Sequence, residues 1–175
     1  MVDRARETLD FIQEEGGDAS IFQADVTNAD DCRDMVEAAI KRYGRLDILD
    51  NNVGISRGET VVEVSEEQWD QIMTVNVKSV MLTSKYAIPA MVKSGGGSII
   101  NISSMAGHRV TPGGQVGMYS ATKHAVKALT EAMRGELAAK GSPIKIGTIS
   151  PGMVETEFHV KMGADAAEIK MLDPD

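Results

Sequence analysis

The chain has 175 residues, of which 42% are hydrophobic and 25% charged, and this composition fits one soluble globular domain with a sizeable core. The net charge of −8 and the lack of a Lys/Arg cluster argue against nucleic acid and anionic membranes as partners. The single cysteine, Cys32, cannot form an internal disulfide, and the sequence opens without a signal peptide, so we expect a cytoplasmic location and no membrane span.

The first half of the chain is predicted to alternate between helices and strands. In order, the expected elements are a polar helix over 1–15, a strand over 19–26, a helix over 32–43 and a short apolar strand over 46–49. Gly16-Gly17 should end the first helix, and the polar residues 27–30 should cap the second.

The second half continues this alternation. Ser65 starts a long helix with a capping-box-like pattern, and it should run to about Met91. A glycine turn over 95–97 precedes a strand over 98–102, a helix carrying Tyr119 ends near Gly141, and a last strand covers 144–149. Strands that alternate with helices of this length predict an α/β fold whose parallel sheet is covered on both faces.

The most informative stretch is Tyr119-Ser120-Ala121-Thr122-Lys123. On a helix, residues four apart lie on the same side, so an ammonium should lie beside a phenol. A nearby cation favours phenolate, so we expect the pKa of Tyr119 to fall and the phenol to exchange protons with an alcohol or carbonyl near neutral pH. Taken alone, this short pattern is more often a surface tyrosine and a solvated lysine.

Other polar motifs accompany this pair in a characteristic order. They are Asn51-Asn52-Val53-Gly54 after a strand, Asn76 inside the long helix, Ser103-Ser104 ending a strand before Gly107, and Ser150-Pro151-Gly152 after the last strand. In open α/β sheets, ligands bind at the edge where the strands end. The motifs therefore predict a ligand site at that edge.

This ordered set resembles the short-chain dehydrogenase/reductase family from about Ala24 to Thr156. Val53 replaces the alanine usual in the family, and Asp50 stands where an apolar strand residue is expected. The resemblance implies a Rossmann-like doubly wound sheet and hydride transfer between NAD or NADP and a secondary alcohol or ketone. It also implies a homodimer or homotetramer formed through the helices of Ser65 and Tyr119.

The resemblance implies four catalytic residues. Tyr119 would be the general acid or base, Lys123 would lower its pKa and hold the nicotinamide ribose, and Ser104 would bind the substrate oxygen. Ser103 is the rival for this serine role, and either hydroxyl could simply cap the strand end. Asn76 would hold a water that links Lys123 to solvent, or would only bond a nearby carbonyl.

The cofactor residues implied by the resemblance come from three turns, in addition to Tyr119 and Lys123. They are Asp25 and Val26 at the adenine, Asn52 and Gly54 near its ribose, and Pro151, Gly152, Val154 and Thr156 along the nicotinamide. Asp25 could instead cap a helix, and the turn at Asn52 could be purely structural. His108, His124 and His159 lack metal-ligand spacing with Cys32, so no metal site is expected.

The family's glycine-rich phosphate turn, T-G-x-x-x-G-x-G, is missing near the start of this sequence. Against the family pattern, residues 1–175 therefore form one partial nucleotide-binding domain without the first two strands and without the last helix and strand. This leaves the choice between NAD and NADP open. The alternatives to an enzyme are a non-catalytic dinucleotide-binding module and a structural subunit that pairs with a full-length partner.

Overall fold

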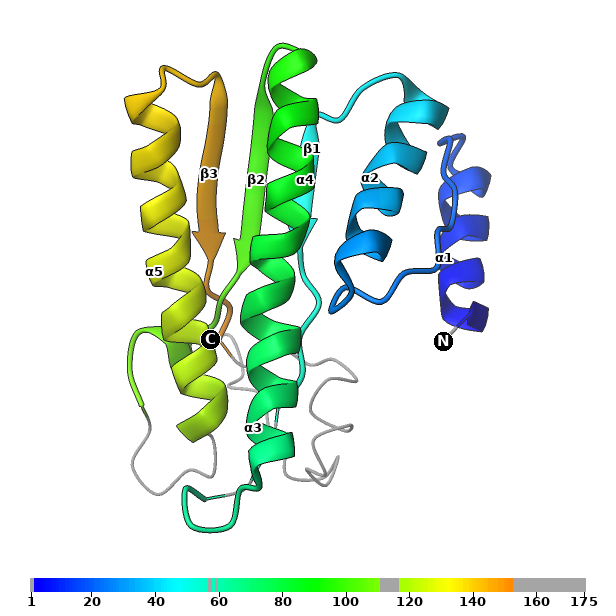
Figure 1. The fold of residues 1–175 in the computed structure, drawn as a ribbon. Helices are drawn as coiled ribbons and strands as arrows, with labels where there is room; N and C mark the ends of the chain where they lie inside the picture. The colour runs from blue at the N-terminus through cyan, green and yellow to red at the C-terminus, as the bar shows by residue number, and fades with distance from the viewer. Residues whose placement is uncertain (1, 57, 59, 111–116, 153–175) are drawn as a thin grey trace, which may run out of the picture.

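Three parallel strands form the centre of the structure, a computed structural model that describes residues 2–56, 58, 60–110 and 117–152. The strands are β1 (Ile48–Asn51), β2 (Gly97–Ile102) and β3 (Ile144–Ile149), and they lie in the order β1-β2-β3 (Figure 1). Ile48 lies opposite Ser98, and Gly97 lies opposite Ile144. The parallel α/β sheet predicted from the alternating elements is confirmed.

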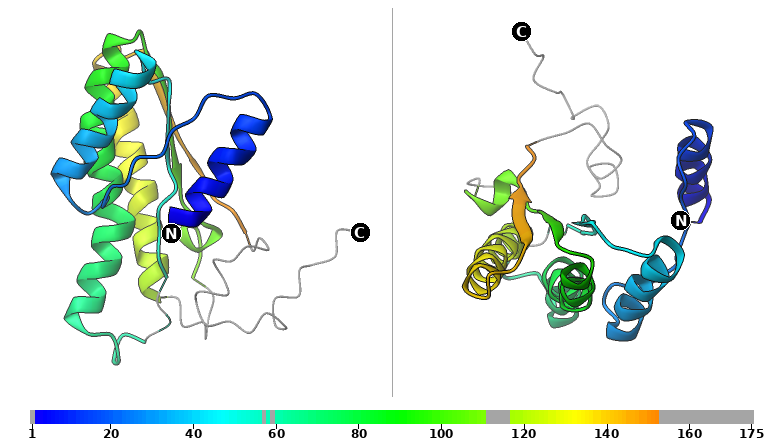
Figure 2. Two further views of the ribbon diagram at one scale, coloured as in Figure 1. Left: turned by 90° about the vertical axis from the view of Figure 1, so that its right-hand side faces the viewer. Right: turned by 90° about the horizontal axis from the view of Figure 1, so that it is seen from above.

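The helices connect these strands in sequence. They are α1 (Val2–Glu14), α2 (Ala29–Tyr43), α3 (Glu66–Met73), the π-helix η1 (Thr74–Lys78), α4 (Ser79–Lys93), the 3₁₀-helix η2 (Met105–Gly107) and α5 (Gly117–Ala139). Seen from above, α2, α4 and α5 lie on one side of the sheet and α1 lies on the other (Figure 2). The core fills the layer between α4, α5 and the sheet, with Val80, Met91, Ile99, Val126 and Ile146 among its buried members.

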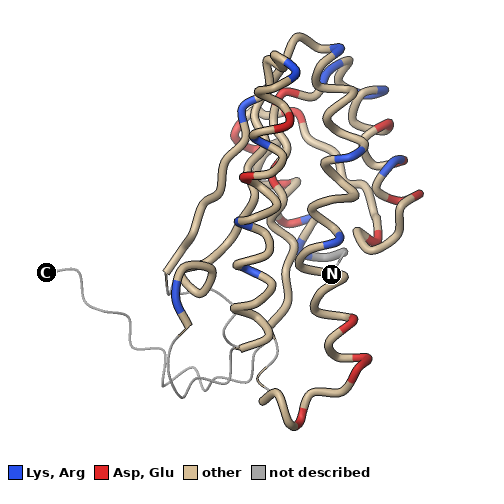
Figure 3. Tube along the Cα trace, turned by 60° about the vertical axis from the view of Figure 1, so that its left-hand side comes forward, with Lys and Arg blue, Asp and Glu red and all other residues tan. Residues whose placement is uncertain are grey.

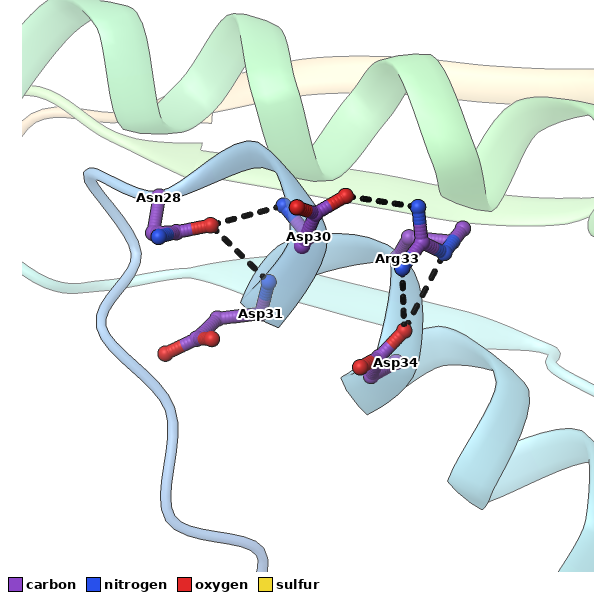
Figure 4. A network of polar contacts seen from close by, with 5 residues as sticks. All are labelled: Asn28, Asp30, Asp31, Arg33 and Asp34. Atoms are coloured by element: carbon purple, nitrogen blue, oxygen red, sulfur yellow. Dashed lines mark hydrogen bonds and ion pairs between the residues drawn. The ribbon is translucent and has the colours of Figure 1, made fainter.

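The predicted cap and the predicted end of α2 are confirmed, although the helix begins at Ala29, three residues before the predicted start. The Asn28 side chain accepts hydrogen bonds from the backbone N–H groups of Asp30 and Asp31, which satisfies donors that have no partner inside the helix (Figure 4). Arg33 forms ion pairs with Asp30 and Asp34 on the same turn. Gly44 ends the helix with a φ of 78°, a left-handed conformation that glycine adopts without strain.

The long helix predicted from Ser65 is confirmed, and it contains one irregular turn. Ser65 and Gln68 form the reciprocal hydrogen bonds of a capping box at the start of α3. The helix then passes through the π-turn η1 into α4, and Figure 1 shows the three segments as one continuous rod. Asn76 lies in this π-turn, a distortion that occurs frequently at functional sites.

The strand predicted over 19–26 is wrong, because residues 17–25 form no strand. A strand needs a hydrogen-bonded neighbour, and the described chain offers this segment none. Ile21 and Phe22 are consequently 44% and 47% exposed.

The predicted cover on both faces of the sheet is incomplete in the described part of the chain, since only α1 lies on the second side. Side chains on the face away from α4 and α5 remain accessible, and Ile48 is 63% and Ile149 52% exposed. The strand predicted over 46–49 begins two residues later, so Asn51 is its last residue.

Charged residues of both signs are spread over the helices (Figure 3). Lysine and arginine alternate with aspartate and glutamate, so no continuous basic stripe forms along the trace that the structure describes. Among the described helices, none combines the length and the apolar character required to cross a bilayer.

Candidate active site

The end of β2 carries two serines with different surroundings. Ser103 is 2% exposed, and its hydroxyl donates to the backbone carbonyl of Lys123 at 3.0 Å. Ser104 begins the turn η2, where its Oγ accepts from the N–H of Ala106 at 3.1 Å. Ser103 is thus engaged in tying β2 to α5, whereas Ser104 lies beside Tyr119.

Tyr119 and Lys123 lie one turn apart on α5, as predicted. Lys123 Nζ lies 5.5 Å from the centroid of the Tyr119 ring. The ammonium is almost buried, with 5% of Lys123 exposed, and it donates to the carbonyl of Ile102 at 2.7 Å. Helix α5 and the end of strand β2 therefore join a phenol, an ammonium and a hydroxyl in one place.

The predicted fall in the pKa of Tyr119 is wrong for this structure. Burial of the half-buried phenol raises its pKa, because a phenolate is poorly solvated there, and a side-chain hydrogen bond with Ser104 opposes the rise. The ammonium of Lys123 donates to the Ile102 carbonyl and has little effect on the pKa of Tyr119.

Burial also lowers the pKa of Lys123, from 10.5 to about 8. Below pH 8 folding must remove a charged ammonium from water, which opposes folding, and the penalty is relieved as the pH rises from 8 towards 10.5. At pH 7 most molecules keep the cation, so the charge is present at a cost in stability.

Replacing Lys123 with Met should therefore raise the free energy of unfolding at pH 7 by roughly 1–2 kcal/mol. The gain should shrink as the pH approaches 10, and urea unfolding at pH 7 and pH 9.5 measures both values. The exposed Lys140 provides the matched control, since Lys140→Met should change stability by less than about 0.5 kcal/mol at either pH. A gain that grows with pH would contradict this account.

Asn76 is 1% exposed, and its amide forms three hydrogen bonds within the protein. Its Oδ1 accepts from the N–H of Ile55 at 2.8 Å, and its Nδ2 donates to the Ile55 carbonyl at 2.8 Å and to Thr122 Oγ1 at 3.0 Å. The side chain thus ties the loop after β1 to the helix of Tyr119. The prediction that it bonds a nearby carbonyl is confirmed, and its part in holding a water remains a prediction.

The turn after β1 reaches the same place. A Cβ on Gly54 would lie 3.5 Å from Asn76 Oδ1 and 3.6 Å from Lys123 Nζ, so this backbone lines the site directly. Asn52 is exposed beyond the end of β1. Gly107 is the glycine that packing requires, because a Cβ there would lie 2.8 Å from the Lys123 carbonyl oxygen.

The structure places Asp25 and Val26 on the loop before α2. The carboxylate of Asp25 accepts from the N–H and the hydroxyl of Thr27, at 2.9 and 2.7 Å, and these bonds lower its pKa. Asn28, not Asp25, caps α2, so the alternative prediction of Asp25 as the helix cap is wrong. Val26 is partly buried, and its carbonyl accepts from Cys32 Sγ.

The turn after β3 approaches the serine turn. The carbonyl of Pro151 accepts from the N–H of Met105 at 2.9 Å, and a Cβ on Gly152 would lie 4.0 Å from Met105 Cγ. Val154 and Thr156 lie outside the described residues. The described chain contains no cluster of acidic, histidine and cysteine side chains that could hold a metal ion.

A buried polar ladder supports the site, and sequence reasoning missed it. Thr83 Oγ1 donates to Asn51 Oδ1 at 2.6 Å, Asn51 Nδ2 donates to Asn101 Oδ1 at 2.8 Å, and Asn101 Nδ2 donates to Thr130 Oγ1 at 2.8 Å. The ladder joins α4, β1, β2 and α5 in the layer where the core is otherwise apolar. The available signal for this ladder in the sequence was one asparagine near the end of each of two strands, Asn51 and Asn101, which lie opposite each other in the sheet.

The donor chemistry fits the nicotinamide half of a dinucleotide. Lys123 has three N–H donors, and the acceptor found for it within the described residues is the Ile102 carbonyl, which leaves donors for ribose hydroxyls. At the starts of α2 and α3, the side chains of Asn28 and Ser65 already accept from backbone N–H groups that could otherwise bind a phosphate.

A parallel sheet whose strand ends gather a Tyr–Lys pair, a serine and a glycine turn defines a Rossmann-type nucleotide-binding domain. Comparison with known proteins agrees, since the sequence model of the short chain dehydrogenases matches residues 1–167. The chain belongs to this family of NAD(P)-dependent oxidoreductases.

Individual relatives show how much of the family's length is present. The chain is 35% identical to the 3-oxoacyl-[acyl-carrier-protein] reductase FabG of Thermotoga maritima, over 95% of this chain and 68% of that protein. A short-chain type dehydrogenase/reductase from Mycobacterium marinum superposes with a TM-score of 0.86 at 35% identity, covering 92% of this chain and 63% of that one. A structure of ElxO with NADPH bound superposes with a TM-score of 0.74 at 33% identity, covering 84% of this chain and 59% of that one. The chain spans about three fifths of the length of other curated relatives that it matches, among them an oxidoreductase of Staphylococcus saprophyticus and the bovine dehydrogenase/reductase SDR family member 11.

Proposed function

We propose that this chain is the catalytic part of an oxidoreductase that transfers hydride between NAD or NADP and a secondary alcohol or ketone. The observation that carries the proposal is the meeting of Tyr119, Lys123 and Ser104 at the end of β2. Membership of the family and the NADPH bound to the related ElxO support the choice of cofactor. The nicotinamide group would supply the hydride when bound.

The proton chemistry belongs to Tyr119. When a ketone is reduced, its hydroxyl gives a proton to the carbonyl oxygen, and when an alcohol is oxidised, its phenolate takes that proton. Burial keeps the phenol protonated at neutral pH, which suits the role of acid. Ser104 donates a hydrogen bond to the same substrate oxygen, where negative charge develops, and Lys123 holds the nicotinamide ribose.

The remaining predicted residues would hold the cofactor. Lys123 and Gly54 lie together and would face the ribose, and Pro151 and Gly152 lie beside the serine turn, where the nicotinamide would lie. Asn52, Asp25 and Val26 would meet the adenosine half, and Val154 and Thr156 would extend the nicotinamide wall. In this proposal Asn76 fixes the Gly54 loop against α5 and holds the relay water.

A non-catalytic dinucleotide-binding module is the second candidate. It would use the same cofactor contacts of Lys123 and the Gly54 turn, without proton transfer by Tyr119. Such a module would bind nucleotide without turning over any alcohol or ketone.

Titration of the purified chain with NADH and with NADPH, followed by nucleotide fluorescence, tests the proposal. We expect weak but saturable binding to one nucleotide in preference to the other, and Lys123→Met should weaken it at least about tenfold because a charge-assisted hydrogen bond is lost. Lys140→Met serves as the control and should leave the titration unchanged. No saturable signal from a chain that is shown to be folded would contradict cofactor binding by these residues.

A further inference from the structure

His108 lies at the end of the serine turn and contacts two other elements. Its Nε2 lies 3.0 Å from Ser150 Oγ, just after β3, and its Nδ1 lies 3.1 Å from Lys127 Nζ on α5. Lys127 stands one helical turn beyond Lys123. One imidazole therefore joins the serine turn, the tyrosine helix and the turn of Pro151.

The chemistry of the two partners determines the state of this ring. An ammonium can only donate, so Nδ1 must accept, and the imidazole is neutral with its proton on Nε2. Nε2 then donates to Ser150 Oγ. This arrangement excludes a serine nucleophile activated by His108, because the nitrogen facing Ser150 carries a proton and cannot take another.

The ring completes a set of contacts that hold the turn in place. The N–H groups of Ser103 and Met105 donate to the carbonyls of Ile149 and Pro151, at 2.8 and 2.9 Å. The N–H of His108 donates to the Met105 carbonyl at 3.0 Å and closes η2. These bonds secure the start of the turn, and the His108 side chain secures its end.

We propose that His108, held in its Nε2–H tautomer by Lys127, is a positioning residue that keeps Ser104 directed at Tyr119. The inference rests on the proposed function of the site, and it adds a residue that acts through Ser104 and does not touch the substrate. The Ser104 hydrogen bond that counteracts the raised pKa of Tyr119 provides a way to observe this action.

The test follows the ionisation of Tyr119 by ¹⁹F NMR in the full chain labelled with 3-fluorotyrosine, with Tyr119→Phe used to assign its signal. We expect Ser104→Ala to raise the pKa of Tyr119, His108→Ala to raise it by the same amount, and the double variant to raise it no further. Met105 N–H exchange should accelerate about tenfold in His108→Ala, while protection in β2 stays unchanged and shows that the fold is intact.

Matched variants separate positioning from general damage. Lys127→Gln keeps a donor for Nδ1 and should leave the Tyr119 titration unchanged, whereas Lys127→Met should shift it in the direction of His108→Ala. A normal titration in His108→Ala, or additive effects of His108→Ala and Ser104→Ala, would overturn the inference. No cofactor is needed for these readouts, so a failure of nucleotide binding would overturn only the proposed function.

Discussion

Replacement of Tyr119 with Phe is expected to lower the turnover of a secondary alcohol or ketone by about 10²–10⁴-fold. The variant removes one oxygen, the atom that would carry the proton, and keeps the ring that packs beside Lys123. Steady-state absorbance of NADH or NADPH measures turnover, and nucleotide fluorescence measures binding in the same samples. Affinity for the nucleotide should change by less than about threefold, since Lys123 keeps its charge and its bond to Ile102.

A matched change elsewhere on the chain makes this result specific. Tyr43 is 42% exposed on α2, far along the chain from the site, and Tyr43→Phe should leave turnover unchanged. Equal turnover rates for Tyr119→Phe and the unchanged chain would mean that Tyr119 takes no part in the proton transfer. Nucleotide binding without turnover in the unchanged chain would instead favour the non-catalytic module.

The second large effect concerns stability. Asn101→Ala should lower the free energy of unfolding by about 2–4 kcal/mol, because it leaves Asn51 Nδ2 and Thr130 Oγ1 buried without these partners. Asn101 is fully buried, so water cannot replace the lost bonds. Urea unfolding followed by circular dichroism provides the measurement.

Asn52 is the appropriate control for that experiment, since it is the same residue type and lies exposed one position after β1. Asn52→Ala should change stability by less than about 0.5 kcal/mol. A cost for Asn101→Ala no larger than for Asn52→Ala would mean that the polar ladder contributes nothing to the fold.

Local signals in the sequence were sufficient for most elements. Asn28 and Gly44 mark the ends of α2 because capping depends on the nearest backbone groups, and the capping box at Ser65 depends on Gln68 three residues away. The strand predicted over 19–26 does not form, and the reason is not local. Its β-like pattern is local, but strand formation requires hydrogen bonds to a neighbour that the pattern cannot supply.

For this protein, the sequence by itself determined the family, the parallel α/β architecture and the presence of a Tyr–Lys pair on one helix face, because these depend on order, spacing and helical periodicity. Only the tertiary structure showed the different surroundings of Ser103 and Ser104 and the raised pKa of Tyr119, and revealed the ladder from Thr83 to Thr130 and the bridge through His108. Those features depend on burial and on contacts between residues that are distant in the chain. Solvation and long-range pairing arise only when the elements pack together.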